Sequence, residues 1–107
     1  MLIAKVTGAL VATQKVASMV GRKMLVVEPY RVDPKTRDQL VTTGRAMIAV
    51  DTVGAGAGEF VLLTQGSSAR LTPETKSLPV DTVIIGIIDT VHLDHLCVYS
   101  KEPKSGT

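Results

Sequence analysis

Two short loops of small residues enclose one apolar strand between Ala49 and Arg70, in the stretch AVDTVGAGAGEFVLLTQGSSAR. The first loop, residues 54–58, alternates glycine with alanine, and the second, residues 66–70, reads GSSAR. Loops of this kind either hold a ligand or let another chain come very close, because small residues leave the backbone accessible. The functional question is which of these two purposes the loops serve.

A nucleotide-binding interpretation of the first loop is weak. Gly54 and Gly56 match the start of a dinucleotide fingerprint, but Glu59 occupies the third glycine position. Phosphate sites of this type also need a helix N-terminus directly after the glycines, and residues 59–65 predict a strand instead. The Glu59 carboxylate would also repel a phosphate. Tight turning and close backbone approach explain the loop better.

A serine nucleophile in the second loop would need a positioned base. Ser67 and Ser68 are the candidate nucleophiles, and the two histidines of the chain, His92 and His95, lie much further along it. Nothing in the spacing brings them together. A turn whose hydroxyl groups bond to the local backbone is the favoured interpretation, so we expect no catalytic residue here.

Three acids lie at strand ends or within apolar strands: Asp51, Asp81 and Asp89. Buried acids can act in acid–base chemistry, but more often they accept backbone hydrogen bonds or pair with arginine. We expect Asp89 to be the most strongly desolvated of the three, because its neighbours are apolar. For Arg70 we expect an ion pair with Asp51, Glu59 or Asp81, possible also across a subunit boundary.

A metal site is matched only loosely by His92, Asp94, His95 and the single Cys97. Strands border this segment, no further ligand set is apparent, and histidines of a surface turn are the simpler interpretation. We therefore expect no metal and no cofactor. One cysteine excludes an internal disulfide and indicates a reducing compartment.

Composition narrows the possible partners. The chain has 107 residues, enough for one domain, and 45% of them are apolar although only three are aromatic. The net charge of +2 comes from scattered basic residues, which argues against nucleic acid, and so does the shortage of rings for base stacking. No apolar run approaches the ~20 residues of a membrane span, and the N-terminus lacks the order of a signal peptide. We expect a cytoplasmic protein that does not bind membranes.

Period-2 alternation predicts a small, mainly β protein. Gly8 is expected to cause a bulge or a sharp bend in the first strand, and Pro29 to mark an edge or bend in the second. The run 82–91 is apolar on both faces, which suggests a closed or nearly closed barrel packed against something outside itself. The expected strands are residues 2–12, 23–32, 45–53, 59–65, 82–91 and 96–100, with a loop at 33–44, a helical turn at 72–77, a turn at 92–95, a single domain over 1–100 and a flexible tail at 101–107.

Two motifs, DTVGAG at 51–56 and GSSAR at 66–70, follow one another with one strand between them. In these motifs the sequence resembles the EutN/CcmL family of bacterial microcompartment shell proteins, the pentamers that close the vertices of carboxysomes and metabolosomes. The resemblance runs nearly end to end, except for the 33–44 loop and the tail. Further matching residues are Gly8, residues 13–15, Gly21, residues 23–25, Gly58, Glu59, Val61, Leu62, residues 79–81 and residues 86–89.

The resemblance implies a five-stranded barrel of the oligonucleotide-binding (OB) type with a short α-helix, assembled as a homopentamer. It implies a structural vertex protein without enzymatic activity, whose ring supplies curvature and whose edges contact hexameric and pseudohexameric shell proteins. The residues expected at the subunit interface and central opening are Asp51, Gly54, Ala55, Gly56, Gly58, Glu59, Gly66, Ser67, Ser68 and Arg70.

Two other functions remain open on the sequence alone. OB-type barrels often bind single-stranded nucleic acid, so a nucleic-acid-binding module is the first alternative. A small enzyme that uses Ser67 or Ser68 with His92 or His95 is the second, although no positioned triad is apparent.

Overall fold

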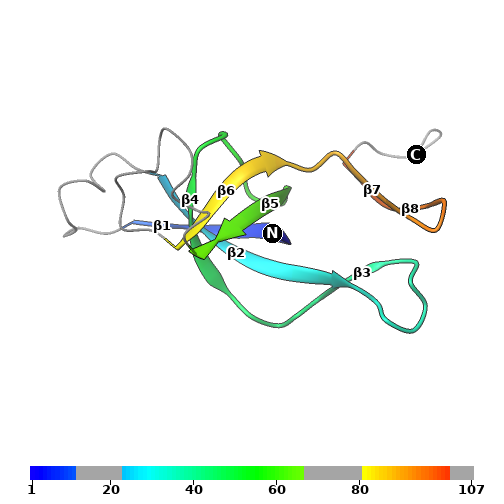
Figure 1. Ribbon diagram of the computed structural model, residues 1–107. Helices are drawn as coiled ribbons and strands as arrows, with labels where there is room; N and C mark the ends of the chain where they lie inside the picture. The colour runs from blue at the N-terminus through cyan, green and yellow to red at the C-terminus, as the bar shows by residue number, and fades with distance from the viewer. Residues whose placement is uncertain (12–22, 67–80, 102–107) are drawn as a thin grey trace.

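Eight β-strands make up most of the described chain in the computed structural model, which describes residues 1–11, 23–66 and 81–101 (Figure 1). The strands are β1 (Leu2–Leu10), β2 (Lys23–Val32), β3 (Leu40–Thr42), β4 (Met47–Asp51), β5 (Phe60–Gln65), β6 (Thr82–Ile87), β7 (Thr90–Leu93) and β8 (Leu96–Ser100).

Five of these strands close into a barrel. The main sheet has the order β1-β5-β6-β4-β2-β3, and β1 also pairs with β2, which joins the two sides of the sheet. Strands β4 and β6 run parallel, whereas the other neighbours in the barrel are antiparallel. The predicted small five-stranded barrel is therefore confirmed.

The barrel interior is built from aliphatic side chains at alternate strand positions. Strand alternation sends every second residue inward, as Ala4 and Val6 on β1 and Val61 and Leu63 on β5 show. The buried residues that form this cluster are Ala4, Val6, Leu25, Val27, Ala49, Ala55, Val61, Leu63 and Ile84. With almost no aromatic residues, the chain fills a narrow barrel with small side chains.

Both predicted irregularities lie where the pairing of the strands changes. The pairing of β1 with β2 shifts register between Val6 and Gly8. Pro29 lies between the end of the pairing of β2 with β4, at Val27, and the start of its pairing with β3, at Tyr30. Because proline cannot donate to a ladder, this change of partner is a suitable place for it.

The predicted strand 82–91 is wrong as a single element. Strand β6 ends at Ile87, and the chain leaves the barrel before β7 begins at Thr90. The physical reason is the length of its partner: β5 begins at Phe60, whose carbonyl accepts the Ile88 N–H at 2.8 Å, so no strand remains to pair beyond that point.

A register shift also changes which face the β6 side chains occupy. The shift falls opposite Leu62 and Leu63, and as a result Ile84 and Ile87 both lie toward the barrel core. Strict alternation along the strand would place these two isoleucines on opposite faces, because they are three residues apart. The doubly apolar character of β6 has a second cause in an outer cluster, in which buried Val50 and Val83 pack with Met24 and Ile85.

The β7–β8 hairpin, residues 90–100, is here called the arm. It forms a separate two-stranded sheet that extends to one side of the barrel (Figure 1). The turn is shorter than the predicted 92–95, because His92 still belongs to β7. Asp94 and His95 alone make it, with φ of 52° and 65°, the positive values that a tight two-residue hairpin needs.

The expected loop 33–44 contains a strand that the sequence did not reveal. Strand β3 pairs with the last three residues of β2, from Tyr30 to Val32. The two paired segments extend away from the barrel (Figure 1). Its three residues are too few for a periodic signal. The predicted helical turn at 72–77 lies outside the described residues, and so does the predicted tail after Lys101.

Candidate functional site

The first loop, residues 54–58 and here called the glycine loop, lies at one end of the barrel, between the end of β4 at Asp51 and the start of β5 at Phe60. Its position is fixed from inside by Ala55, which is fully buried in the barrel core. Its backbone is also tied to β1: the Gly58 N–H donates to the Val6 carbonyl at 2.8 Å, and the Val6 N–H donates to the Glu59 carbonyl at 2.9 Å. The loop is therefore a well-anchored cap on the barrel.

Asp51 holds the start of this loop. Its carboxylate accepts the backbone N–H groups of Val53, Gly54 and Ala55 at 3.0, 3.2 and 2.9 Å. Its side chain is only 1% exposed, and Lys23 compensates the charge from 3.4 Å. The Lys23 ammonium also donates to the Ala55 carbonyl at 2.8 Å.

Glu59 holds the other half of the loop and connects it to the chain beyond the arm. One carboxylate oxygen accepts the Gly56 N–H at 2.7 Å, and the other pairs with Lys101 at 3.0 Å. The hydrogen bond from Lys101, followed by that from Gly56, lowers the pKa of Glu59 below its ordinary 4.5. The same contact with Glu59 raises the pKa of Lys101 above its ordinary 10.5.

These two carboxylates occupy the loop N–H groups that a phosphate would need. Asp51 accepts the N–H groups of Val53, Gly54 and Ala55, and Glu59 accepts that of Gly56. These donors are therefore already hydrogen-bonded within the chain. Strand β5 follows directly, which confirms the strand that was predicted in place of a phosphate-binding helix. We therefore interpret the loop as a structural element rather than a phosphate-binding site.

The glycines of the loop differ in why the chain uses them. Gly54 and Gly58 have φ of 81° and 89°, where a side chain is strained. Gly56 has no such restriction, and a Cβ there would meet only the Glu59 carboxylate, at an ordinary 3.5 Å. The described part of this chain therefore gives no steric reason for glycine at position 56.

The structure separates the first loop from Gly66, where the second predicted loop begins. The first precedes β5 and Gly66 follows it, so they lie at opposite ends of that strand, about 20 Å apart for six residues. The Gly66 N–H donates to the Asp81 carbonyl at 2.8 Å. Ser67, Ser68 and Arg70 lie outside the described residues.

The prediction that Asp89 would be the most desolvated acid is wrong. Asp89 and Asp81 are both exposed, and Asp51 carries the buried carboxylate. Asp89 lies where the chain leaves the barrel, so its apolar neighbours do not enclose it. The partner of Asp51 within the described residues is Lys23, a residue that the sequence did not single out.

The remaining chemical candidates lie on the arm. His92, His95 and Cys97 are exposed, and the Cys97 thiol donates to the Tyr99 carbonyl at 3.2 Å. Within residues 1–11, 23–66 and 81–101, no three His, Cys, Asp or Glu side chains come close enough together to hold a metal ion.

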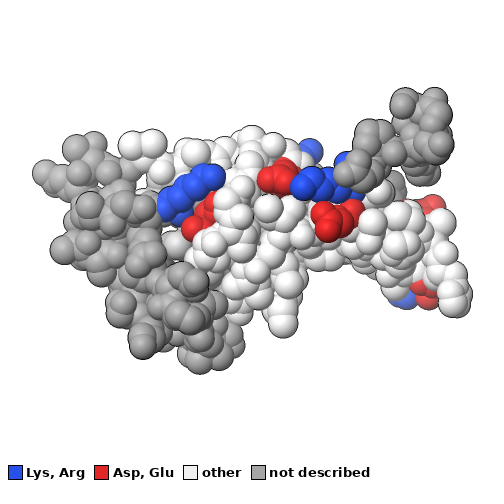
Figure 2. All heavy atoms as spheres, turned by 90° about the horizontal axis from the view of Figure 1, so that it is seen from above, with Lys and Arg blue, Asp and Glu red and all other residues white. Residues whose placement is uncertain are grey.

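The surface charge is mixed. Figure 2 shows the barrel face with acidic and basic side chains beside one another and large uncharged areas between them. Binding of a nucleic-acid backbone uses a concentrated basic surface, which this face does not present in its described part.

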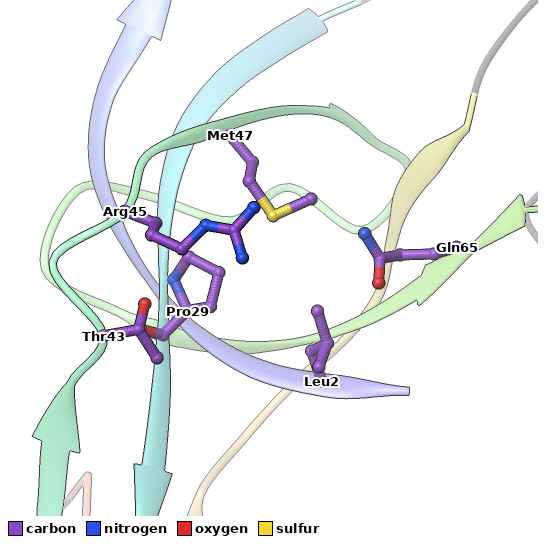
Figure 3. Close-up of a pocket in the computed structure, with 6 residues that line it drawn as sticks. All are labelled: Leu2, Pro29, Thr43, Arg45, Met47 and Gln65. Carbon is purple, nitrogen blue, oxygen red and sulfur yellow. The ribbon is translucent and has the colours of Figure 1, made fainter.

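A pocket lies at the barrel end opposite the glycine loop and was missed by the sequence reasoning. It has a volume of about 370 Å³, and its side chains point into one opening (Figure 3). Its residues come from four segments that only the closed barrel brings together, so no local motif could have indicated it. The lining residues are Leu2, Pro29, Thr43, Arg45, Met47 and Gln65.

No helix among the described residues has the length and apolar character to cross a membrane.

Comparisons with known proteins agree with this geometry. The sequence model of the family described as "Ethanolamine utilisation protein EutN/carboxysome" matches residues 1–89. The chain is 44% identical over 91 residues to the microcompartment shell vertex protein PduN of Salmonella typhimurium, covering 85% of this chain and 98% of PduN. It is 41% identical over 104 residues to the carboxysome shell vertex protein CcmL of Gloeobacter violaceus, covering 97% of this chain and 98% of CcmL.

Solved structures give the same result. The structure of Gloeobacter violaceus CcmL superposes with a TM-score of 0.82 at 42% identity, covering 94% of this chain and 98% of that one. The pentameric shell protein GrpN of Rhodospirillum rubrum superposes with a TM-score of 0.71 at 39% identity, covering 87% and 98%. A closed barrel, a glycine loop bonded to its own chain, and these matches together show that the chain belongs to the EutN/CcmL family of microcompartment shell vertex proteins.

Proposed function

We propose that this chain is a structural vertex protein that forms a homopentamer and caps the corners of a bacterial microcompartment shell, as in a carboxysome or a metabolosome. The observation that carries the proposal is the superposition of the closed barrel on the pentameric shell protein GrpN over 87% of this chain. The glycine loop supports it, because its donors are committed to Asp51 and Glu59 rather than to a substrate.

The mechanism is geometric. A sheet of six-sided tiles stays flat, and closing it into a shell requires five-sided tiles at the corners. A head-to-tail contact between copies closes into a ring when its rotation angle fits. The pentamer then supplies curvature, and its outer edges contact hexameric and pseudohexameric shell proteins inside the cytoplasm.

Within the ring, we place the predicted residues at the subunit interface and central opening. Because the two loops lie at opposite ends of β5, one neighbour contacts both only if β5 runs along the interface. Gly56 supports this arrangement, since no described part of its own chain requires glycine there. The proposed interface residues are Asp51, Gly54, Ala55, Gly56, Gly58, Glu59, Gly66, Ser67, Ser68 and Arg70.

The mass of the protein in solution is the first test. Light scattering at micromolar concentration should give the mass of five chains, and a stable monomer would contradict the proposal. In cells, shells made without this chain should be elongated or open in electron micrographs, whereas regular closed shells would refute a vertex function.

A bulky residue at position 56 tests the interface. Gly56→Leu should leave the barrel folded but reduce ring formation, because the side chain would enter space that a second copy occupies. Thr36→Leu, in the exposed loop between β2 and β3, is the matched control and should assemble normally. Intact rings and closed shells from Gly56→Leu would refute the close approach at this position.

A further inference from the structure

The arm has no buried core of its own. All buried apolar side chains of the described chain belong to the barrel strands and the glycine loop, and none lies between residues 90 and 100. Strands β7 and β8 pair with each other and with no other strand of the described chain. A single two-stranded hairpin is marginally stable in water, so this arm needs another surface to cover it.

The arm is amphipathic in cross-strand pairs. Val91 pairs with Tyr99, and Leu93 pairs with Leu96, so these four side chains share one face. At the base of the arm, the Tyr99 ring packs on Phe60 with centroids 4.4 Å apart. At the tip, Leu96 is 47% exposed, so the apolar face is left uncovered where it is farthest from the barrel.

Polar contacts hold the arm in place at both ends. At its base, the Lys101 N–H donates to the Asp89 carbonyl at 2.7 Å, and the Lys101 side chain pairs with Glu59. At its tip, one Asp94 oxygen pairs with Arg37 at 3.0 Å. The other Asp94 oxygen has no partner within the described residues. The tip of the arm therefore presents the Leu96 side chain and the Asp94 carboxylate side by side.

The pocket at the barrel end has the complementary character. Leu2, Pro29 and Met47 give it apolar walls, and Arg45 extends over the opening beside them (Figure 3). No acid among the described residues pairs with the Arg45 guanidinium. A volume of about 370 Å³ is near the lower end of the 300–1,000 Å³ that ligand pockets occupy, which is enough for protruding side chains.

We propose that the arm of one copy docks on the next copy in the ring, with Leu96 in the barrel-end pocket and Asp94 facing Arg45. This inference rests on the proposed homopentamer. A head-to-tail ring needs two different complementary surfaces on every chain, and the arm tip and the pocket form such a pair. An apolar centre with a polar, charged rim is also the usual anatomy of a protein interface.

Charge exchange is the first test of this contact. It is done in an Arg37→Ala background, so that the ion pair within the chain plays no part. In that background, Asp94→Arg or Arg45→Glu should each raise the protein concentration at which half of the rings dissociate by about tenfold or more. The two changes together should restore it to within about threefold of the background. Single changes without effect, or no rescue, would overturn the Asp94–Arg45 contact.

Leu96 tests the apolar half of the contact. Leu96→Asp should weaken the ring by about tenfold or more, whereas Leu96→Met, which keeps the apolar volume, should assemble normally. Because Leu96 lies outside the barrel core, circular dichroism should show both variants folded. A Leu96→Asp ring as stable as that of the unchanged chain would overturn the docking of Leu96.

Cross-linking between tagged chains gives an independent test. Chains with the native Cys97 are assembled with chains that carry Thr43→Cys at the pocket rim and Cys97→Ser, so that a short bis-maleimide joining the two positions must bridge two subunits. The expected product is a mixed dimer on a denaturing gel, and the control with Thr7→Cys, an exposed β1 position toward the opposite barrel end, should give none. Pentamers without this product would overturn the arm contact and leave the ring intact. A monomer would instead overturn the proposed function.

Discussion

The barrel and the arm are both built from short paired strands, yet only the barrel has an interior. In the barrel, Leu63 and Ile84 are fully buried by their own chain. In the arm, Leu96 remains nearly half exposed and its strands form a sheet of two. Apolar side chains in the barrel therefore stabilise the fold of one chain. Apolar side chains on the arm remain available for contact with a second copy.

The comparison shows how a small chain can divide its apolar residues. A barrel of this size fills its interior with a few aliphatic side chains, and the remaining apolar residues must lie outside it. Placing several of them on the arm concentrates the apolar surface on one side of the chain and so favours one orientation of contact. An even distribution over the barrel would not do this. Four predictions can break or sharpen this distinction, from the largest expected effect to the smallest.

Leucine truncation in the two regions should differ most. Leu63→Ala should lower the free energy of unfolding by about 2–5 kcal/mol, because it leaves a cavity in the barrel core. Leu96→Ala should lower it by less than about 1 kcal/mol when measured on dissociated chains. Urea denaturation of both variants checks the difference. Equal losses would mean that the arm is packed as tightly as the barrel within one chain.

The buried carboxylate at the barrel end should be the next most sensitive feature. Asp51→Ala leaves three backbone N–H groups without their acceptor and should lower the free energy of unfolding by about 2–3 kcal/mol. Lys23→Ala, which removes only the half-exposed partner of Asp51, should cost less. Thermal unfolding of both variants gives the order, and a larger loss for Lys23→Ala would show that charge neutralisation outweighs backbone capping.

Two glycines of the same loop should respond differently to a methyl group. Gly58→Ala should lower the free energy of unfolding by about 1 kcal/mol, because φ there is 89°. Gly56→Ala should be close to neutral in dissociated chains, since its Cβ would have room. Denaturation below the concentration of ring formation makes the measurement. Equal effects would contradict the assignment of position 56 to contacts between copies.

The contribution of the Glu59–Lys101 contact to the stability of the fold should depend weakly on pH. Because folding lowers the Glu59 pKa below 4.5, the Glu59–Lys101 contact stabilises the fold above that pH and loses its contribution as the pH falls through the folded pKa. Because folding raises the Lys101 pKa above 10.5, the contribution is also lost as the pH rises past that value. Glu59→Gln should flatten the acidic side of the stability profile, with Asp38→Asn, at an exposed position between β2 and β3, as the control. An unchanged acidic limb would show that other carboxylates set it.

Periodicity predicts the barrel strands well because their alternation is long enough to read. It fails where tertiary context sets the limits. Strand β3 has three residues and owes its existence to pairing with the end of β2. The end of β6 is set by where β5 begins, and the run 82–91 contains no local sign of that limit.

The candidate site was partly predictable for similar reasons. The glycine pattern and the acid at position 51 indicate a structural loop, and an acid bonded to backbone amides was among the expected outcomes. Lys23, Lys101 and Arg45 could not be found, because each meets its surroundings through segments distant in sequence. The ring of five followed only from the family resemblance, since a rotation angle is not encoded in composition or periodicity.

Strand β6 has a consequence for the order of events during synthesis. It lies between β5 and β4, and its pairing at Val83 and Ile84 closes the barrel late in the chain. A nascent chain that has not yet released residue 87 from the ribosome has two unpaired strand edges and no closed barrel. Because a closed barrel is what fixes the pocket and the arm relative to each other, the two proposed docking surfaces reach their relative positions only after β6 has paired.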